Sequence, residues 1–320
     1  MHSQPIMRRL GRLLLGRRVP AGPWQSSFLI SARFQIQTFP SSSTLGHRRF
    51  ASLRRHERPD FPDPWLLQYQ KQRPNRYGPE VDSSMNREYH KWYSGRLGRD
   101  MELLVFGHGG VPVLVFPTSG GRFFEFEDRG MVSSLGGKID AGQIQLYCVD
   151  SIDMESWYNR NVPPRWRIAR HVQYEDYLIH EVVPLIRQKN WDRHCVALGC
   201  SFGGFHAANI AFRHPDVFTG LLSMSGRFDM SNFLGGYHDQ DLYFHSPIQY
   251  LQNLSDPWFF ERYRQNTYIL GTGWDDQCLG SNQHLDGILS YKGIPHKLYV
   301  WDTWNSHDWP TWMMMVNEYL

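Results

Sequence analysis

From residue 111 on, short apolar runs alternate with longer amphipathic segments, and two strand-like segments of mixed polarity precede them. The segments that predict strands are "REYHKWYS", "RDMELLVFG", "VPVLVFP", "IQLYCVD", "HCVALGC", "FTGLLSMSG", "NTYILGTG" and "HKLYVWD". The third of these is continuously apolar, as expected for a strand that is buried on both faces of a sheet. The "HGG" at residues 108–110, between the second and third runs, predicts a hairpin turn.

The segments between these runs have the spacing of amphipathic helices. The predicted helices are "FEDRGMVSSLGGKI", "ARHVQYEDYLIHEVVPLIRQ", "GFHAANIAFRHP", "SNQHLDGILSYKG" and "HDWPTWMMMVNEYL", the last with Asp308 as its N-cap. Residues 227–256 are predicted to be a long irregular insert. Strands alternating with helices indicate an α/β fold with a mostly parallel central sheet and helices on both faces. A leading hairpin is expected to add antiparallel strands at one edge.

The first 56 residues differ in composition from the remainder. They contain no Asp, Glu or Lys, whereas Arg and Ser recur, and "MRRLGRLLLGRR" places Leu10, Leu13 and Leu14 on one helical face. This pattern is typical of an organelle transit peptide, and "RRFAS" at 48–52 resembles a mitochondrial processing site. We therefore expect residues 1–50 to be a mitochondrial presequence. The alternative is a disordered tail on a cytoplasmic protein.

Composition narrows the classes of function. Residues 51–85 are rich in Pro, Arg and Asp and are expected to be an extended lead-in to a catalytic domain over 86–320. A net charge of +3 with 20% charged residues does not indicate a nucleic-acid binder. The four cysteines form no CxxC, so no metal site is predicted, and no apolar run approaches the length of a membrane span. Nothing in the pattern indicates an oligomeric state.

The turn Gly199-Cys200-Ser201-Phe202-Gly203 matches G-x-S-x-G between a predicted strand and a predicted helix. This context favours a nucleophilic serine, because a strained turn there lifts the hydroxyl above the sheet, and glycines avoid backbone collisions. The following helix directs unpaired amides toward a developing oxyanion. The alternative is a tight turn with an incidental serine.

A serine nucleophile needs a histidine base and a carboxylate, in the chain order Ser, acid, His. Of the 15 histidines, His307 alone follows the last strand and precedes the final helix. The acid should follow the preceding strand, where Asp275 and Asp276 are adjacent. We favour Asp276, keep Asp275 as the alternative acid, and expect the other carboxylate to be a solvated loop charge. Asp150 precedes the serine and is expected to be structural.

An oxyanion hole needs two amide donors. One is expected from Phe202, the residue after the nucleophile, and the second from the loop 118–121 after the third strand, with Ser119 as the predicted donor. The "HGG" at 108–110 comes before that strand and is expected at the opposite edge of the sheet.

Five blocks of sequence together resemble one family. They are "VFPTSGGRFFEFEDRGM", "VDSIDMESWY", "GCSFGGFHAANIAFRHPDVF", "SGRFD" and "WDTWNSHDWPTW". They resemble the α/β-hydrolase superfamily, in particular esterases related to esterase D, over about residues 87–320. The resemblance implies a Ser–Asp–His hydrolase without metal or organic cofactor, and maps onto Ser201, Asp276 and His307. The sequence departs from the family in lacking a His-Gly pair after the third strand, where Pro117 and Thr118 stand.

We therefore expect a serine esterase that cleaves a small-molecule carboxylic ester or thioester through an acyl-enzyme. An acyltransferase with the same triad and a catalytically silent binding scaffold are the alternatives. The insert 227–256 is expected to be either a lid or a surface loop. The aromatic residues near the predicted catalytic loops either shape an acyl pocket or pack in the core; they are Trp157, Tyr158, Trp274 and Trp304.

Overall fold

The computed structural model describes residues 85–320, apart from the side chains of residues 231 and 232. The predicted presequence over 1–50 and the lead-in up to residue 84 lie outside the described residues. No helix in the described part is both long and apolar enough to cross a bilayer.

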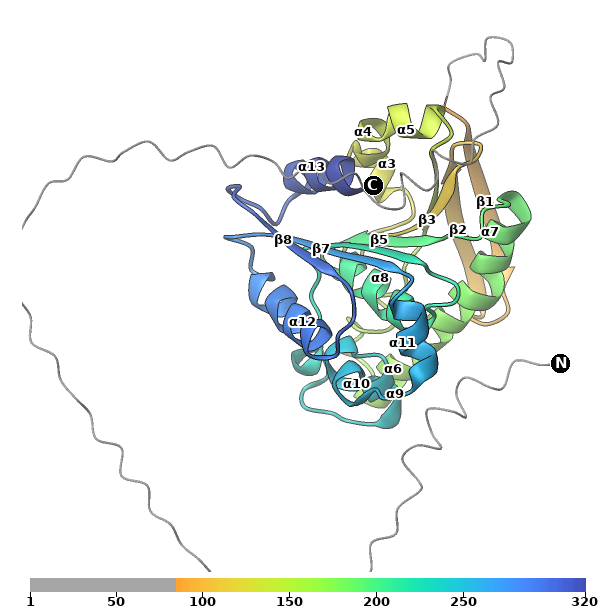
Figure 1. Ribbon diagram of the computed structural model, residues 1–320. Coiled ribbons are helices and arrows are strands. Elements are labelled where there is room, and N and C mark those ends of the chain that lie inside the picture. Colours follow the sequence, from red (N-terminus) through yellow and green to blue (C-terminus); the bar gives the residue numbers. More distant parts are fainter. Residues whose placement is uncertain (1–84) are drawn as a thin grey trace, which may run out of the picture. The chain divides into compact units, whose positions relative to one another are not determined.

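An eight-stranded sheet forms the centre of the described part, in the order β1-β2-β4-β3-β5-β6-β7-β8 (Figure 1). β1 pairs with β2, and β2 with β4, in antiparallel orientation, and all other pairs are parallel. The predicted α/β-hydrolase fold, with its antiparallel leading strands, is confirmed. The strands are β1 Arg87–Ser94, β2 Arg99–Phe106, β3 Val111–Phe116, β4 Ile144–Val149, β5 Val196–Cys200, β6 Gly220–Met224, β7 Thr267–Gly273 and β8 Lys297–Trp301.

The hairpin predicted at 108–110 is wrong. β2 pairs with β4, and β3 lies on the far side of β4, so this loop joins two strands that are not neighbours. Gly107 and Gly110 both have a φ of 91°, and a Cβ on Gly110 would lie 2.2 Å from the carbonyl carbon of Gln143. The glycines therefore allow this loop to pack closely against the residues before β4. The same glycine-rich pattern is found in hairpin turns, so the sequence does not distinguish the two.

Helices cover both faces of the sheet, α3–α5 and α13 on one and α6, α8 and α12 on the other (Figure 1). The segment predicted as one helix at 126–139 is divided among three, with Gly130 between the first two at a φ of 77°. The helices are α3 Glu125–Asp128, α4 Met131–Ser134, α5 Gly136–Asp140, α6 Pro164–Tyr177, the π-helical turn η1 Leu178–Val182, α7 Val183–Lys189, α8 Phe202–Arg213, the 3₁₀ turn η2 Ser231–Leu234, α9 Gln240–Phe244, α10 Pro247–Asn253, α11 Pro257–Tyr263, α12 Leu279–Tyr291 and α13 Trp309–Tyr319.

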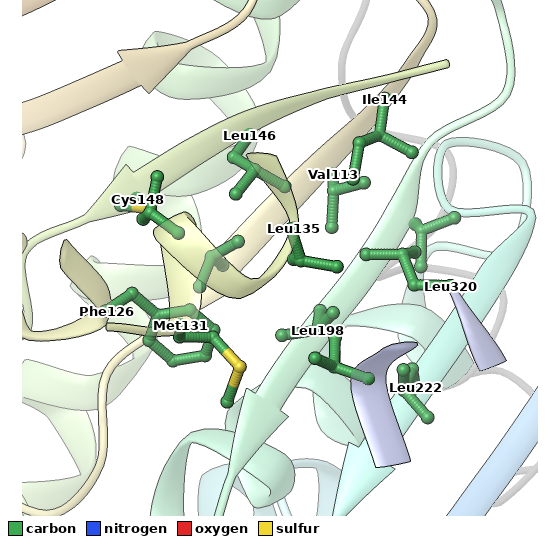
Figure 2. Close-up of a cluster of buried hydrophobic side chains, with 14 of the residues drawn as sticks. Val113, Phe126, Met131, Leu135, Ile144, Leu146, Cys148, Leu198, Leu222 and Leu320 are labelled. Carbon is green, nitrogen blue, oxygen red and sulfur yellow. The ribbon is translucent and has the colours of Figure 1, made fainter. Parts of the chain in front are cut away.

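The main core lies between the sheet and the face covered by α3–α5 and α13. Figure 2 shows side chains from four neighbouring strands meeting residues of these helices and the C-terminal Leu320. The strand residues are Val113, Leu146, Leu198 and Leu222, and all are at most 2% exposed. Burying one such side chain contributes about 1.5–3 kcal/mol, so this cluster gives a rigid base to the loops that follow the strands.

The prediction that the insert at 227–256 is irregular is wrong. The insert contains η2, α9 and α10. Its Met230, Leu234 and Leu242 are buried in a second apolar cluster with Trp157 and Phe202. The helices are only four to seven residues long, too short for an apolar period to become visible in the sequence.

Candidate active site

Ser201 occupies a strained turn between β5 and α8. Its backbone has φ 55° and ψ −118°, outside the regions that residues other than glycine usually adopt. A Cβ on Gly199 would lie 2.3 Å from the carbonyl carbon of Gly203, and one on Gly203 would lie 2.5 Å from the carbonyl oxygen of Phe116. Both glycines are therefore needed for the close approach of strand, turn and helix, which is the arrangement predicted for a nucleophile elbow.

The three side chains predicted as a triad lie in one hydrogen-bonded chain. His307 Nε2 is 3.0 Å from Ser201 Oγ, and His307 Nδ1 is 2.8 Å from Asp276 Oδ1. The residues follow β5, β7 and β8, whose carboxyl ends meet at one edge because the strands are parallel. The geometry suits proton transfer from the serine to an imidazole oriented by a carboxylate.

The electrostatics of the pair Asp276–His307 favour its charged form. The Asp276 side chain is fully buried and also accepts a hydrogen bond from the Cys278 amide at 2.7 Å. Burial raises its pKa, but the side chains of His307 and Ser225 and this amide together hold the pKa below its ordinary value. Burial lowers the pKa of His307, but Asp276 and Cys278 outweigh it and raise the pKa to about 9.

Asp275, the alternative acid, is hydrogen-bonded to the two residues before His307 and not to its imidazole. Its carboxylate accepts hydrogen bonds from the Asn305 amide at 2.8 Å, from the Ser306 amide at 3.2 Å and from the Ser306 hydroxyl. The Asp275 carboxylate is exposed to solvent, as expected for the neighbouring charge, but it also binds the two residues that precede His307. Asp150 is structural, as expected, because its buried carboxylate accepts hydrogen bonds from Arg122 and the Phe123 amide.

The loop after β3 lies against the first turn of α8. A Cβ on Gly203 would meet the carbonyl oxygens of Phe116 and Pro117, each at 2.5 Å. The amide of Thr118 is already bonded to Glu125, at 2.8 Å, which excludes it as an oxyanion donor. The amide of Phe202 has no acceptor within its helix because it is the first helical residue. The assignment of Ser119 as the second donor stays a prediction.

The four aromatic candidates have different surroundings. Trp157 is fully buried and packs on Phe202, so it belongs to the core. Tyr158 donates a hydrogen bond to Ser119 Oγ at 2.8 Å and packs on Phe202. Trp274 and Trp304 are exposed and pack edge to face, with ring centroids 5.1 Å apart. The exposed pair thus lies on the same two loops as Asp276 and His307.

Sequence reasoning missed two residues at the acid. Ser225, with a φ of 55°, follows β6, influences the Asp276 carboxylate and accepts a hydrogen bond from Trp312 Nε1 at 2.8 Å. Cys278 has a thiol close to both Asp276 and His307, and the ligand atoms of these three residues lie within 4.8 Å of one another. This is a ligand set that zinc accepts, but here the imidazole and carboxylate are bonded to each other. The sequence signal that could have pointed to Ser225 and Cys278 is their position shortly after the ends of β6 and β7.

The fold is that of the α/β-hydrolase class, and the arrangement of Ser201, His307 and Asp276 is the one that a serine hydrolase requires. Residues 94–318 match the model of the esterase family described as "Putative esterase". The chain therefore belongs to this family and is a carboxylic-ester hydrolase. No curated protein sequence matches it.

Solved structures share the fold at low sequence identity. A ferulic acid esterase has a TM-score of 0.59 and 19% identity, and the match covers 73% of this chain and 96% of that chain. An S-formylglutathione hydrolase from Agrobacterium tumefaciens has a TM-score of 0.57 and 15% identity, with coverages of 75% and 95%. That from Staphylococcus aureus has a TM-score of 0.54 and 13% identity, with coverages of 75% and 96%. The predicted membership of an esterase group is confirmed by the family match.

Proposed function

We propose that the protein cleaves a carboxylic ester or thioester through an acyl-enzyme formed on Ser201, with His307 as the base and Asp276 as the acid of the triad. The observation that carries this proposal is the continuous hydrogen-bonded chain from Ser201 Oγ through both nitrogens of His307 to Asp276. A structural serine has no need for a strained backbone that presents its hydroxyl to a histidine.

The reaction proceeds in two halves. In the first half, Ser201 Oγ attacks the carbonyl carbon while His307 Nε2 takes the hydroxyl proton. The tetrahedral oxyanion accepts hydrogen bonds from the amides of Phe202 and Ser119, and its collapse expels the alcohol or thiol, which receives the proton from Nε2. In the second half, His307 deprotonates a water molecule that attacks the acyl carbon, and the acid departs as Ser201 regains its proton.

Asp276 has two tasks in this scheme. Its hydrogen bond to Nδ1 fixes the tautomer that leaves Nε2 free to accept a proton, and its charge stabilises the imidazolium formed in each half-reaction. Burial of the carboxylate strengthens both effects because little water screens the pair.

A fluorophosphonate probe tests the nucleophile. We expect the wild-type protein to take up one label, at Ser201, and Ser201→Ala to abolish labelling and to lower kcat by about 10³ or more. Ser290→Ala, which changes an exposed serine on α12, is the matched control and should label normally. Labelling that survives in Ser201→Ala would exclude Ser201 as the nucleophile.

The same protein preparation separates hydrolysis from acyl transfer. With an activated ester and an added acceptor alcohol, a hydrolase releases the free acid, whereas a transferase forms the new ester in its place. We expect the acid to dominate the products, as measured by chromatography of the reaction mixture.

A further inference from the structure

The loop that carries His307 is attached to the end of β7 through Asp275. We call residues 302–308 the histidine loop. The two carboxylate oxygens of Asp275 divide between its residues: Oδ2 accepts from the Asn305 amide at 2.8 Å, and Oδ1 accepts from both the amide and the hydroxyl of Ser306. The two residues immediately before His307 are thus held by one side chain.

Steric contact supports the same attachment independently of charge. Ser306 is 1% exposed, and a Cβ added to Gly273 would lie 1.9 Å from its Cβ and Oγ. The last residue of β7 therefore has to be glycine for Ser306 to reach its position. Asn305 has a φ of 54°, a left-handed conformation that is unfavourable for most residues. Its bond to Asp275 offsets part of that cost.

We propose that Asp275 is a positioning residue for catalysis, which acts through Asn305 and Ser306 to fix the imidazole of His307 against Ser201. This inference rests on the proposed function. Asp275 does not contact the imidazole, whose Nδ1 is bonded to Asp276, so its role differs from that of the triad acid. The contact of Nε2 with Ser201 depends on the backbone position of His307, and a displacement of about 1 Å in such a contact can cost about 10²-fold in rate.

The test compares three variants for kcat per active site, with active sites counted by the endpoint of fluorophosphonate labelling. Asp275→Asn keeps the shape of the side chain but replaces one acceptor with an NH₂ group that faces an amide donor. We expect kcat to fall by about 10²-fold with KM changed less than threefold. Asp302→Asn removes the same charge from an exposed position in the same loop and should change kcat less than threefold.

Ser306→Ala removes only the hydroxyl contact with Asp275. It should lower kcat in the wild-type background but have little further effect in Asp275→Asn, because the contact is already lost there. Equal losses in both backgrounds would contradict a shared action of the two residues. If Asp275→Asn lowers only the number of active sites and leaves kcat per site unchanged, the role of Asp275 is purely structural. That result would overturn the proposal.

A measurement without turnover separates this inference from the proposed function. In Ser201→Ala, the proton between His307 Nδ1 and Asp276 should give a low-field proton NMR signal, and adding Asp275→Asn should broaden or remove it. A signal that is unchanged by Asp275→Asn would overturn the positioning role. Absence of ester hydrolysis by the wild-type protein, with the signal responding as expected, would instead reject the proposed function.

Discussion

The adjacent carboxylates of Asp275 and Asp276 face different partners. Asp276 is bonded to the imidazole of His307, whereas Asp275 is bonded to the backbone that precedes it. Consecutive residues in the short loop after β7 thus hold the same histidine at two levels, one at the ring and one at the main chain. Two residues of the same type and charge therefore need different measurements to separate their contributions.

The pH dependence of activity should report the contact between Asp276 and His307. Only the neutral imidazole can act as the base, and its pKa is raised to about 9, so wild-type kcat/KM should increase with pH and reach half its maximum above pH 6.5. Asp276→Asn removes the charge that favours the imidazolium. The midpoint should then move to lower pH, and kcat should fall by about 10⁴-fold, by analogy with a serine protease.

The measurement is a pH profile of kcat/KM for wild type and Asp276→Asn, with circular dichroism to show that both are folded. A midpoint that is the same in both proteins would mean that His307 and Asp276 do not titrate as a pair in the free enzyme.

The sequence predicts the contacts of some site residues better than those of others. Ser201 and His307 stand in positions that chain order alone singles out, and the structure places them 3.0 Å apart. The contacts of Asp275 and Ser225 with the site could not be predicted, because they depend on loops that meet only in three dimensions.

At the scale of elements, close backbone contacts constrain the β5–α8 turn. Gly203→Ala would place a methyl group 2.5 Å from two backbone oxygens that cannot move without shifting the end of β3. We expect this variant to lose about 1–3 kcal/mol of unfolding free energy, as overpacking commonly does, and also to lose activity. Gly287→Ala in α12 is the matched control.

Gly287 is exposed in the middle of a helix and has no atom within 4 Å of an added Cβ. Replacing it with alanine should raise the unfolding free energy by about 0.5–1 kcal/mol, because alanine is the better helix former. Urea denaturation of the two variants measures both changes. If Gly203→Ala were as stable as wild type, the close approach of β3 and α8 would not be a constraint.

The positions of the strands along the chain could be predicted better than the order in which the strands pair in the sheet. Each of the eight predicted segments contains one strand. The central strands β3, β4, β5 and β6 are buried along their whole length and need continuous apolar side chains, whereas β1 and β8 are partly exposed. The pairing of β2 with β4 rather than with β3 follows from contacts between distant residues, which a turn at 108–110 does not encode. The short helices of the insert could not be predicted for a related reason. Packing against Trp157 and Phe202 stabilises them, and they show no local apolar period.

For the molecule as a whole, we propose that residues 1–50 direct the protein to mitochondria. The proposal rests on the Arg-rich and Ser-rich composition without acidic residues before residue 57. A fusion of residues 1–56 to a fluorescent protein should enter mitochondria, as seen by microscopy and by protease protection. The same fusion with the arginines of residues 8–18 changed to glutamate should remain cytosolic. A diffuse signal from the unchanged fusion would contradict the proposal.

The hydrogen-bonded chain of Ser201, His307 and Asp276 has a consequence for how activity is acquired. Ser201 and His307 are separated by 106 positions, and Asp276 and His307 by 31. The entropy of closing these loops must be overcome before the side chains meet, and only the completed parallel strands bring their ends together. Catalytic competence should therefore appear late during refolding, after most secondary structure has formed. Enzyme activity then serves as a sensitive reporter of native long-range order.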